Sequence, residues 1–256
     1  MIMLKNKAST AYRLFREGGI KNLCDYAWLR LQVWAKGRKN EVRFDTCVFN
    51  LAGITNDSIR IELITNRYES AERHAVLRYL KRDIPVVELG GSMGVVACVT
   101  NKLLIDPTLH VVVEANPMAI PQLELNRKLN GRQFEIVNRA IAYGVDSVTF
   151  RPSTDLAGSS ITRDGDQSPV TVNTVSLGAL VHDRGFKRFN LVCDIEGLEY
   201  DLVCQEPAVL KNADTIIMET HARYIGEEKF GVMMTKLQEL GLKIVDQIGF
   251  VVILQQ

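Results

Sequence analysis

The sequence lacks the features that would place the protein in a membrane or outside the cell. No stretch approaches the roughly 20 consecutive apolar residues that a transmembrane helix requires. The N-terminus has no apolar core followed by a small-residue cleavage site, so we expect no secretion signal. The five cysteines are scattered and form no C-x-x-C pair, which argues against a disulfide framework or a structural zinc site. We therefore expect a cytoplasmic protein with reduced, mostly buried thiols.

Charge is nearly balanced over the whole chain but not at its beginning. The 256 residues are 46% hydrophobic and 24% charged, with a net charge of +1, as in an ordinary soluble domain. Residues 1–40 alone contain nine Lys or Arg against two acidic residues. Despite this local positive charge, we expect no nucleic-acid partner. Trp28 and Trp34 also lie there, a pattern that suits peripheral contact with the inner face of an anionic membrane. The alternative is a helical arm that packs against its own domain or a second subunit.

The pattern of apolar residues changes at Pro85. Before it, residues 41–66 alternate as β-strands do around a turn at 55–57, and residues 68–82 are spaced as in a helix. After it, strand-length apolar runs alternate with helical stretches, which is typical of a parallel sheet covered on both faces. The last two runs are too close for a helical crossover and should pair antiparallel. The predicted strands are 84–89, 110–113, 134–137, 189–193, 215–218, 242–246 and 249–254, and the helices are 94–104, 117–129, 199–210 and 227–240.

Two parts of the chain fall outside this alternation. We assign residues 1–66 to the basic helical arm and a small β cap, and residues 67–256 to the main domain. Within the main domain, residues 153–169 form a long segment rich in Gly, Ser and Asp between the third and fourth strands. We expect this segment to cover the acceptor, with Ser159 and Ser160 as hydrogen-bonding residues. A mobile surface insertion is the alternative.

The stretch "VVELGGSMGVV", residues 86–96, ends a strand and begins a helix with three glycines in the turn. In an open parallel sheet, ligands bind at the carboxyl ends of the strands, so this turn should face a nucleotide-like molecule. A P-loop needs G-x-x-x-x-G-K-[ST], and no such lysine follows here. A dinucleotide fold needs G-x-G-x-x-G, but the glycines stand at positions 90, 91 and 94, so NAD is disfavoured.

The spacing E-x-G-x-x-x-G, from Glu88 to Gly94, resembles the first motif of S-adenosylmethionine-dependent methyltransferases. That cofactor has an amino-acid tail, which we expect beside Glu88 and the N–H groups of the turn. Twenty residues after Gly94, the strand "HVVVEAN" ends at Glu114, which is placed to accept hydrogen bonds from ribose hydroxyls. Asn116 should cap the next helix. Ala140 in "NRAIA" should lie near the adenine, with ordinary core packing as the alternative.

Farther along, "DIEGLE" follows a strand as it does in FkbM-like methyltransferases, which the chain resembles over residues 67–253. The resemblance also rests on Tyr68-Glu69, "VVEANP", Asn126 and Asn130, "NRAIA", "GSSI" and "IIMETH". It implies an α/β, Rossmann-like class I methyltransferase fold, with a mostly parallel seven-stranded sheet and an antiparallel last strand. It also implies O-methylation of a sugar or of a polyketide-type product. The chain departs from the pattern at Val192, where most relatives have lysine, which points to a different acceptor or another compensating group.

These motifs together predict one set of residues around S-adenosylmethionine. The predicted cofactor-binding residues are Glu69, Glu88, Gly90, Gly91, Ser92, Gly94, Glu114, Ala115, Asn116 and Ala140.

The reaction itself points to a second set of residues. Methyl transfer to a hydroxyl needs alignment, exclusion of water, and a base or a metal that activates the oxygen. Two successive strands end in such groups: Asp194 and Glu196 after "FNLVC", and Glu219 and His221 after "TIIM". We expect these four to be catalytic; they could also bind a divalent ion, although the spacing does not require one. Glu199 falls in the first turn of the next helix, where an acid favours the helix dipole.

Three functions remain in competition at this point. The leading hypothesis is an S-adenosylmethionine-dependent O-methyltransferase acting on a sugar hydroxyl of a surface polysaccharide or lipid-linked glycan. The second is an inactive sugar-binding or scaffold protein that keeps the fold, which the valine at position 192 leaves open. The third is a nicotinamide-dependent oxidoreductase, which the glycine spacing weakens.

Overall fold

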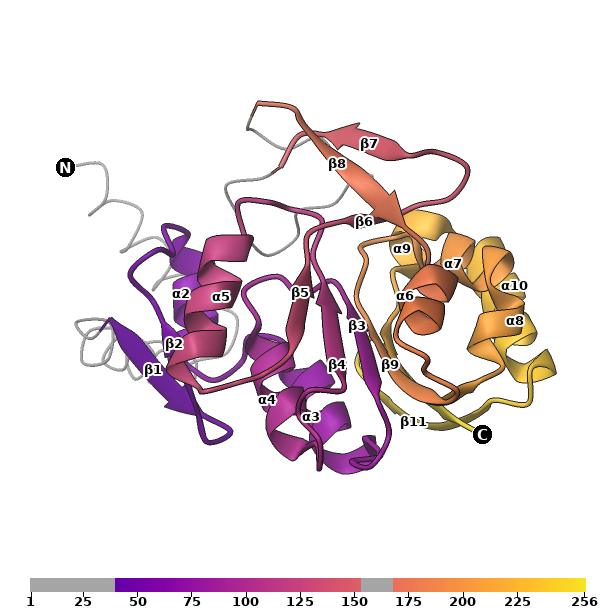
Figure 1. Cartoon of the computed structure of the whole chain (residues 1–256), viewed down its shortest axis with the longest axis horizontal. Coiled ribbons are helices and arrows are strands. Elements are labelled where there is room, and N and C mark those ends of the chain that lie inside the picture. Colours follow the sequence, from indigo (N-terminus) through magenta and orange to yellow (C-terminus); the bar gives the residue numbers. More distant parts are fainter. Residues whose placement is uncertain (1–39, 153–167) are drawn as a thin grey trace, which may run out of the picture.

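The computed structural model describes residues 40–152 and 168–256. A seven-stranded sheet forms the centre of the domain (Figure 1). All strands run parallel except β12, which is antiparallel to both of its neighbours. The chain reverses its direction of travel across the sheet between β3 and β9, which makes this pair the topological switch point. The predicted Rossmann-like α/β fold with an antiparallel last strand is confirmed. The strand order is β5 (Glu135–Val137), β4 (His110–Val113), β3 (Val86–Leu89), β9 (Phe189–Cys193), β10 (Ala213–Glu219), β12 (Val251–Gln255) and β11 (Lys243–Ile248).

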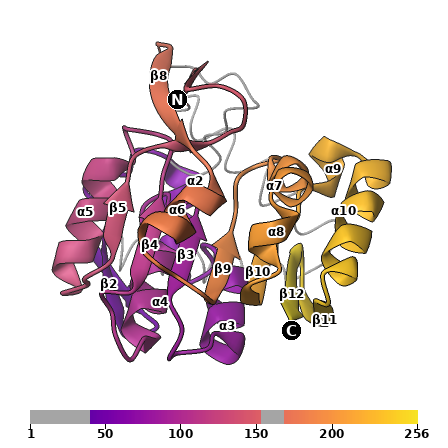
Figure 2. The same ribbon diagram turned by 45° about the vertical axis from the view of Figure 1, so that its right-hand side comes forward.

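Helices cover both faces of this sheet because successive side chains of each strand point to opposite faces. Val86 and Val112 belong to one hydrophobic cluster, and Val87 and Val111 belong to the other. The first cluster lies under α3 (Ser70–Tyr79), α4 (Val95–Leu103) and α5 (Ile120–Leu129). The second lies under α6 (Leu177–Asp183), α7 (Glu199–Gln205), α8 (Pro207–Leu210) and α10 (Glu227–Glu239), as Figures 1 and 2 show from two sides.

Residues 41–66 contain a helix that the sequence analysis missed. The hairpin of β1 (Glu41–Phe44) and β2 (Cys47–Asn50) turns at residues 45–46, not at 55–57. The residues after the expected turn form α2 (Asp57–Ile64) instead of a strand. The side chain of Asn56 accepts hydrogen bonds from the N–H groups of Ser58 and Ile59, so this residue caps a helix.

Two other predicted helix boundaries are wrong for local reasons. Asn116 does not cap the next helix: its side chain accepts from the N–H of Met118, and α5 begins only at Ile120. The single helix expected over 199–210 is broken into α7 and α8. Pro207, the first residue of α8, has no N–H to continue the hydrogen bonding of α7.

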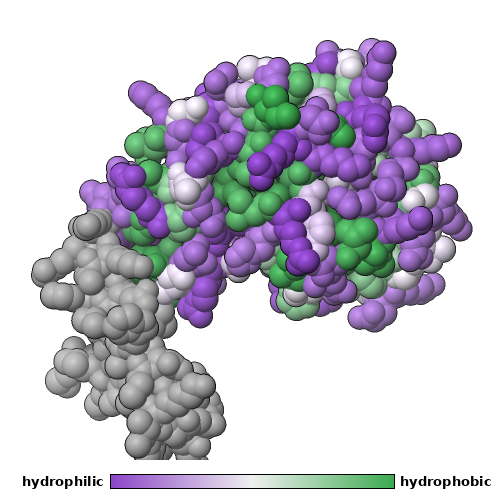
Figure 3. Space-filling view, turned by 90° about the horizontal axis from the view of Figure 1, so that it is seen from below, coloured by the Kyte–Doolittle hydropathy of each residue, from purple (hydrophilic) through white to green (hydrophobic). Residues whose placement is uncertain are grey.

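A second, three-stranded sheet lies over the carboxyl ends of the main strands, at the top of Figure 1. It consists of β6 (Ala140–Ile141), β8 (Val170–Val175) and β7 (Ser147–Phe150). The helical arm and its membrane contact, predicted for residues 1–40, lie outside the described residues except for Asn40, as do Ser159 and Ser160. Among the described residues, no helix is both long enough and apolar enough to span a bilayer. Seen from below, hydrophobic side chains form separate patches between hydrophilic ones (Figure 3).

Asn126 of α5 and Asn130, the residue that follows this helix, fasten the hairpin to the main domain. The side chain of Asn126 accepts from the N–H of Asn50 and donates to the carbonyl of Met93, both at 2.9 Å. The side chain of Asn130 accepts from the N–H of Val48 and donates to its carbonyl, both at 2.7 Å. On the side of β2 that has no neighbouring strand, these amides therefore supply hydrogen bonds that a strand would otherwise make.

Replacing Asn126 with alanine should destabilise the protein by about 2–4 kcal/mol. The change removes two hydrogen bonds and leaves a backbone N–H and a carbonyl without partners, at about 1–3 kcal/mol each. Urea unfolding measures the effect, with Glu124→Ala on the exposed side of the same helix as the control. Equal stabilities of the two variants would contradict this role.

Candidate functional site

A cavity of about 370 Å³ opens at the carboxyl ends of the strands, next to the switch point between β3 and β9. Cavities of this size hold small-molecule ligands and cofactors. Its wall combines the glycine turn, the loop before α3, the end of β4, β6, and the ends of β9 and β10. Of the predicted site residues, the wall contains Glu69, Gly90, Ser92, Glu114, Ala115, Ala140, Asp194, Glu196 and Glu219.

The glycines of the turn have two different roles. Gly90 has φ +90° and faces the cavity, and a Cβ placed on it would lie 1.8 Å from the carbonyl oxygen of Asp194. Gly91 and Gly94 do not line the cavity. A Cβ on either would meet the side chain of Val112 or Leu123 at 2.4 Å. These two glycines permit helix packing, so their prediction as cofactor contacts is not borne out by the geometry.

Glu114 holds the glycine turn in place from the end of β4. One carboxylate oxygen accepts from the N–H of Ser92, and the other accepts from the N–H of Asn116, both at 2.6 Å. Burial raises the pKa of Glu114, although these backbone hydrogen bonds oppose the shift. A carboxylate has about four acceptor sites, so the side chain can still accept from ribose hydroxyls in the cavity. Asn116 is buried and is absent from the cavity wall.

The loop before α3 closes one side of the cavity. The hydroxyl of Tyr68 lies 3.1 Å from the hydroxyl of Ser92, and Glu69 takes a left-handed conformation with φ +47°. Glu72 on the first turn of α3 also lines the cavity, and it was not predicted. Its helical spacing with Ala75 and Val76 could have predicted this position, because that spacing puts the Glu72 carboxylate on the buried face of α3. The cavity residues Arg67 and Arg139 were also missed.

Glu88 lies inside the sheet and not in the cavity wall, so the structure does not place it where the prediction put the cofactor tail. Its side chain is only 2% exposed, and one of its oxygens lies 3.3 Å from Nε2 of His110. Burial raises the pKa of Glu88 to about 8 and lowers the pKa of His110 to about 3. The amide of Asn101 donates to Nδ1 of His110, so the ring proton is on Nε2 and faces Glu88. The neutral pair is the form that this environment favours.

The far end of the cavity gathers carboxyl groups from three elements. Asp194 and Glu196 follow β9, Glu219 is the last residue of β10, and Glu72 comes from α3. Burial, followed by repulsion from Glu219 and Glu196, holds the pKa of Asp194 well above its usual range. Burial also raises the pKa of Glu72 to about 7, and Glu219 adds to that shift. Oδ1 of Asp194 is buried and makes no hydrogen bond within the described part of the chain.

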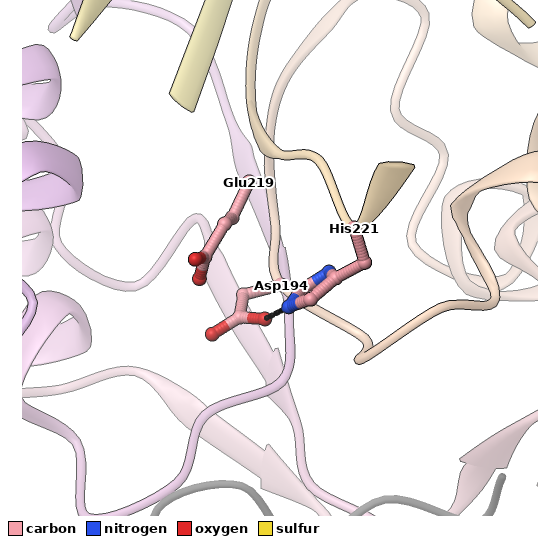
Figure 4. Close-up of side chains that lie close together, drawn as sticks. All are labelled: Asp194, Glu219 and His221. Atoms are coloured by element: carbon pink, nitrogen blue, oxygen red, sulfur yellow. Dashed lines mark ion pairs between the residues drawn. The ribbon is translucent and has the colours of Figure 1, made fainter. Parts of the chain in front are cut away.

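His221 lies behind these carboxylates and not in the cavity wall. Its side chain is 5% exposed, and Nε2 lies 3.5 Å from Glu196 Oε2. Nε2 also lies 3.8 Å from Asp194 Oδ1, the pair joined by the dashed line in Figure 4. Burial lowers the pKa of His221, but the hydrogen bond to Glu199 and the surrounding carboxylates outweigh it, so the net shift is upward. His221, predicted to be catalytic, therefore lies beside Asp194 and outside the cavity wall.

Asp194, Glu219 and His221 are also the one group of metal-ligand side chains found in the described ranges. Each offers one ligand atom, and these atoms lie within 4.8 Å of one another. Two carboxylates and an imidazole would suit a divalent ion such as manganese or zinc. The arrangement thus permits two kinds of chemistry, proton transfer or cation binding.

Comparisons with known proteins give weak similarities. No protein-family model matches the chain, and no curated protein matches it significantly. Among solved structures, the ribosomal protein L11 methylase from Lactobacillus delbrueckii subsp. bulgaricus shares 13% identity over 72% of this chain and 75% of that one, with a TM-score of 0.42. TYW2 from M. jannaschii, in complex with AdoMet, shares 14% identity over 84% of each chain, with a TM-score of 0.42. The description of the fold rests on the strand order, and membership of the FkbM-like family stays a prediction.

Glutamine in place of Glu88 should change the pH dependence of stability while leaving cofactor affinity unchanged. The folded pKa of about 8 exceeds the unfolded value of about 4.3, so the stability that the protonated form provides is lost as pH rises toward 8. Glutamine has the same shape as glutamate and remains neutral beside His110 at every pH. Glu88→Gln should therefore match wild type only near pH 4, and should exceed it by roughly 3–5 kcal/mol at pH 8.

Urea unfolding at several pH values measures this gap, with Glu124→Gln as the exposed control. A constant difference between wild type and Glu88→Gln across the pH range would show that Glu88 is not the buried protonated group.

Proposed function

We propose that the protein is an S-adenosylmethionine-dependent methyltransferase. The observation that carries the proposal is the charge of the cavity wall, where seven carboxyl groups face two arginines, Arg67 and Arg139. This cofactor carries an ammonium and a sulfonium, and carboxylates favour nearby cations. The pyrophosphate of NAD is anionic and would meet the same carboxylates at a cost. The seven acidic residues are Glu62, Glu69, Glu72, Glu114, Asp194, Glu196 and Glu219.

The residues around the glycine turn fit this cofactor. Gly90 allows the chain to pass close to Asp194, because a Cβ at position 90 would collide with the carbonyl group of Asp194. Glu114 would accept from the ribose hydroxyls, and Ala115 with Ala140 would lie against the adenine. When bound, the cofactor supplies a methyl group on a sulfonium, which becomes a neutral thioether when the methyl group leaves.

We further propose that the acceptor is a hydroxyl, in particular that of a sugar in a surface polysaccharide or lipid-linked glycan. An alcohol is a poor nucleophile until a base removes its proton. Asp194 is the best placed base, since it lines the cavity directly after β9 and its side chain is partly exposed there. Its raised pKa also brings it closer to working pH, as general bases require. The scheme needs no metal.

Glu114→Ala should weaken binding of S-adenosylmethionine by at least about tenfold. Hydrogen bonds to a charged group contribute about 1.5–3 kcal/mol, and each 1.4 kcal/mol corresponds to tenfold in affinity. Calorimetry with S-adenosylmethionine, S-adenosylhomocysteine and NAD measures this on wild type, Glu114→Ala and the control Glu124→Ala. Binding of NAD alone would refute the cofactor proposal, whereas tight cofactor binding without methylation of any glycan extract would favour a scaffold.

Asp194→Asn should lower methyl transfer at saturating cofactor by about 100-fold or more, because the amide cannot take the proton. Since the base must be ionised and the pKa of Asp194 is raised, wild-type turnover should increase with pH. Transfer of labelled methyl groups to glycan extracts measures both effects, with exposed Asp183→Asn as the control.

The same assay separates proton transfer from metal chemistry. With Asp194 as the base, dialysis against EDTA should leave turnover unchanged. A loss of activity that magnesium or manganese restores would instead assign Asp194, Glu219 and His221 to cation binding.

A further inference from the structure

Glu199 is fully buried at the start of α7, next to the carboxylates of the cavity but outside its wall. Both of its oxygens accept from the N–H of Gly197 at 3.1 Å. Its Oε1 also lies 2.9 Å from Nδ1 of His221. An acid that served the helix dipole alone would need neither burial nor these contacts, and Asp201 supplies an exposed acid in the same first turn.

The hydrogen bond to Glu199 determines which nitrogen of His221 carries the proton. A carboxylate can only accept, so the proton of this bond belongs to Nδ1. In the neutral ring, which forms above the raised pKa of His221, the lone pair is then on Nε2, the atom that faces Glu196 and Asp194. The ring also stacks on Tyr224 at 5.6 Å between centroids and 12° between planes, which fixes its orientation.

We propose that Glu199 is a positioning residue, which holds the Nε2 lone pair of His221 toward Asp194. The inference rests on the proposed methyl transfer. At 3.8 Å the two groups make no hydrogen bond while Asp194 is an ionised base. Oδ1, the oxygen that faces Nε2, is buried, so Oδ2 takes the proton of the acceptor hydroxyl. Rotation of the carboxyl group can then present the new O–H to Nε2. The acceptor oxygen gains the methyl group, and its proton remains on the Asp194–His221 pair, so atoms and charge balance.

This geometry favours the reaction because it stabilises a state that forms only as the proton moves. An interaction absent from the ground state and present in the transition state raises turnover without tightening substrate binding. The opposite tautomer would place an N–H of His221 against Asp194. That hydrogen bond would stabilise the ionised ground state and weaken Asp194 as a base.

The first measurement is the tautomer of His221 in the wild-type protein, by ¹⁵N NMR at a pH where its ring is neutral. We expect the Nδ1–H form for His221 and the Nε2–H form for His110, whose Nδ1 accepts from Asn101. A His221→Gln variant assigns the signal. An Nε2–H signal for His221 would overturn the proposal, whatever the activity of any variant.

The second measurement compares Glu199→Gln with Asp201→Asn. Glutamine can donate to Nδ1 and reverse the tautomer, so we expect turnover to fall by about 10- to 100-fold, while the KM and the affinity for S-adenosylmethionine change little. Asp201→Asn removes an equivalent dipole charge and should change neither turnover nor tautomer. Equal turnover of wild type and Glu199→Gln, with cofactor binding intact, would refute the positioning role. Absence of cofactor binding in wild type would refute the proposed function instead.

Discussion

The contact between the turn after β3 and the end of β9 determines the geometry of the whole site. Leu89 pairs with Cys193, and the N–H of Asp194 donates to the carbonyl of Leu89 at 2.9 Å. The carbonyl of Asp194 then occupies the space that a side chain on Gly90 would need. Because this contact lies at the switch point, it brings the proposed cofactor turn and the proposed base together. Any residue with a side chain at position 90 would push the turn and Asp194 apart.

The second constraint is electrostatic and follows from crowding carboxyl groups into one cavity. Burial and mutual repulsion raise the pKa values of Glu69, Glu72 and Asp194, so part of the cavity is protonated when no cation is present. A bound cation would lower these pKa values. By linkage, ionisation of Asp194 would in turn favour the cation. In the proposed enzyme, binding of the positively charged cofactor would therefore prepare the base that the reaction needs.

The sequence was sufficient to predict the strands and helices that follow a repeated apolar pattern. It was not sufficient where tertiary contacts determine which residues reach the site. The alternation of strands and helices after Pro85 is strongly periodic, and it gave the sheet and its antiparallel last strand. The cap at Asn56 is a single residue, and the apolar alternation around it concealed α2. Glu72 and Glu199 reach the site region from helices whose placement depends on the packed sheet. The spacing of residues along a helix does not predict how close its side chains lie to the ends of β9 and β10.

A shift of one or two positions along a strand determines whether an acidic side chain lies in the core or in the cavity. Glu88 lies within β3 and shares a face with Val86, so its side chain enters the packed layer beside His110. Asp194 lies one residue beyond β9, where no further strand pairing directs its side chain into a layer. Glu219 is the last residue of β10 and reaches the cavity. A carboxylate within a strand must become neutral or find a partner. One at the strand's carboxyl end borders the cavity and can take part in chemistry there.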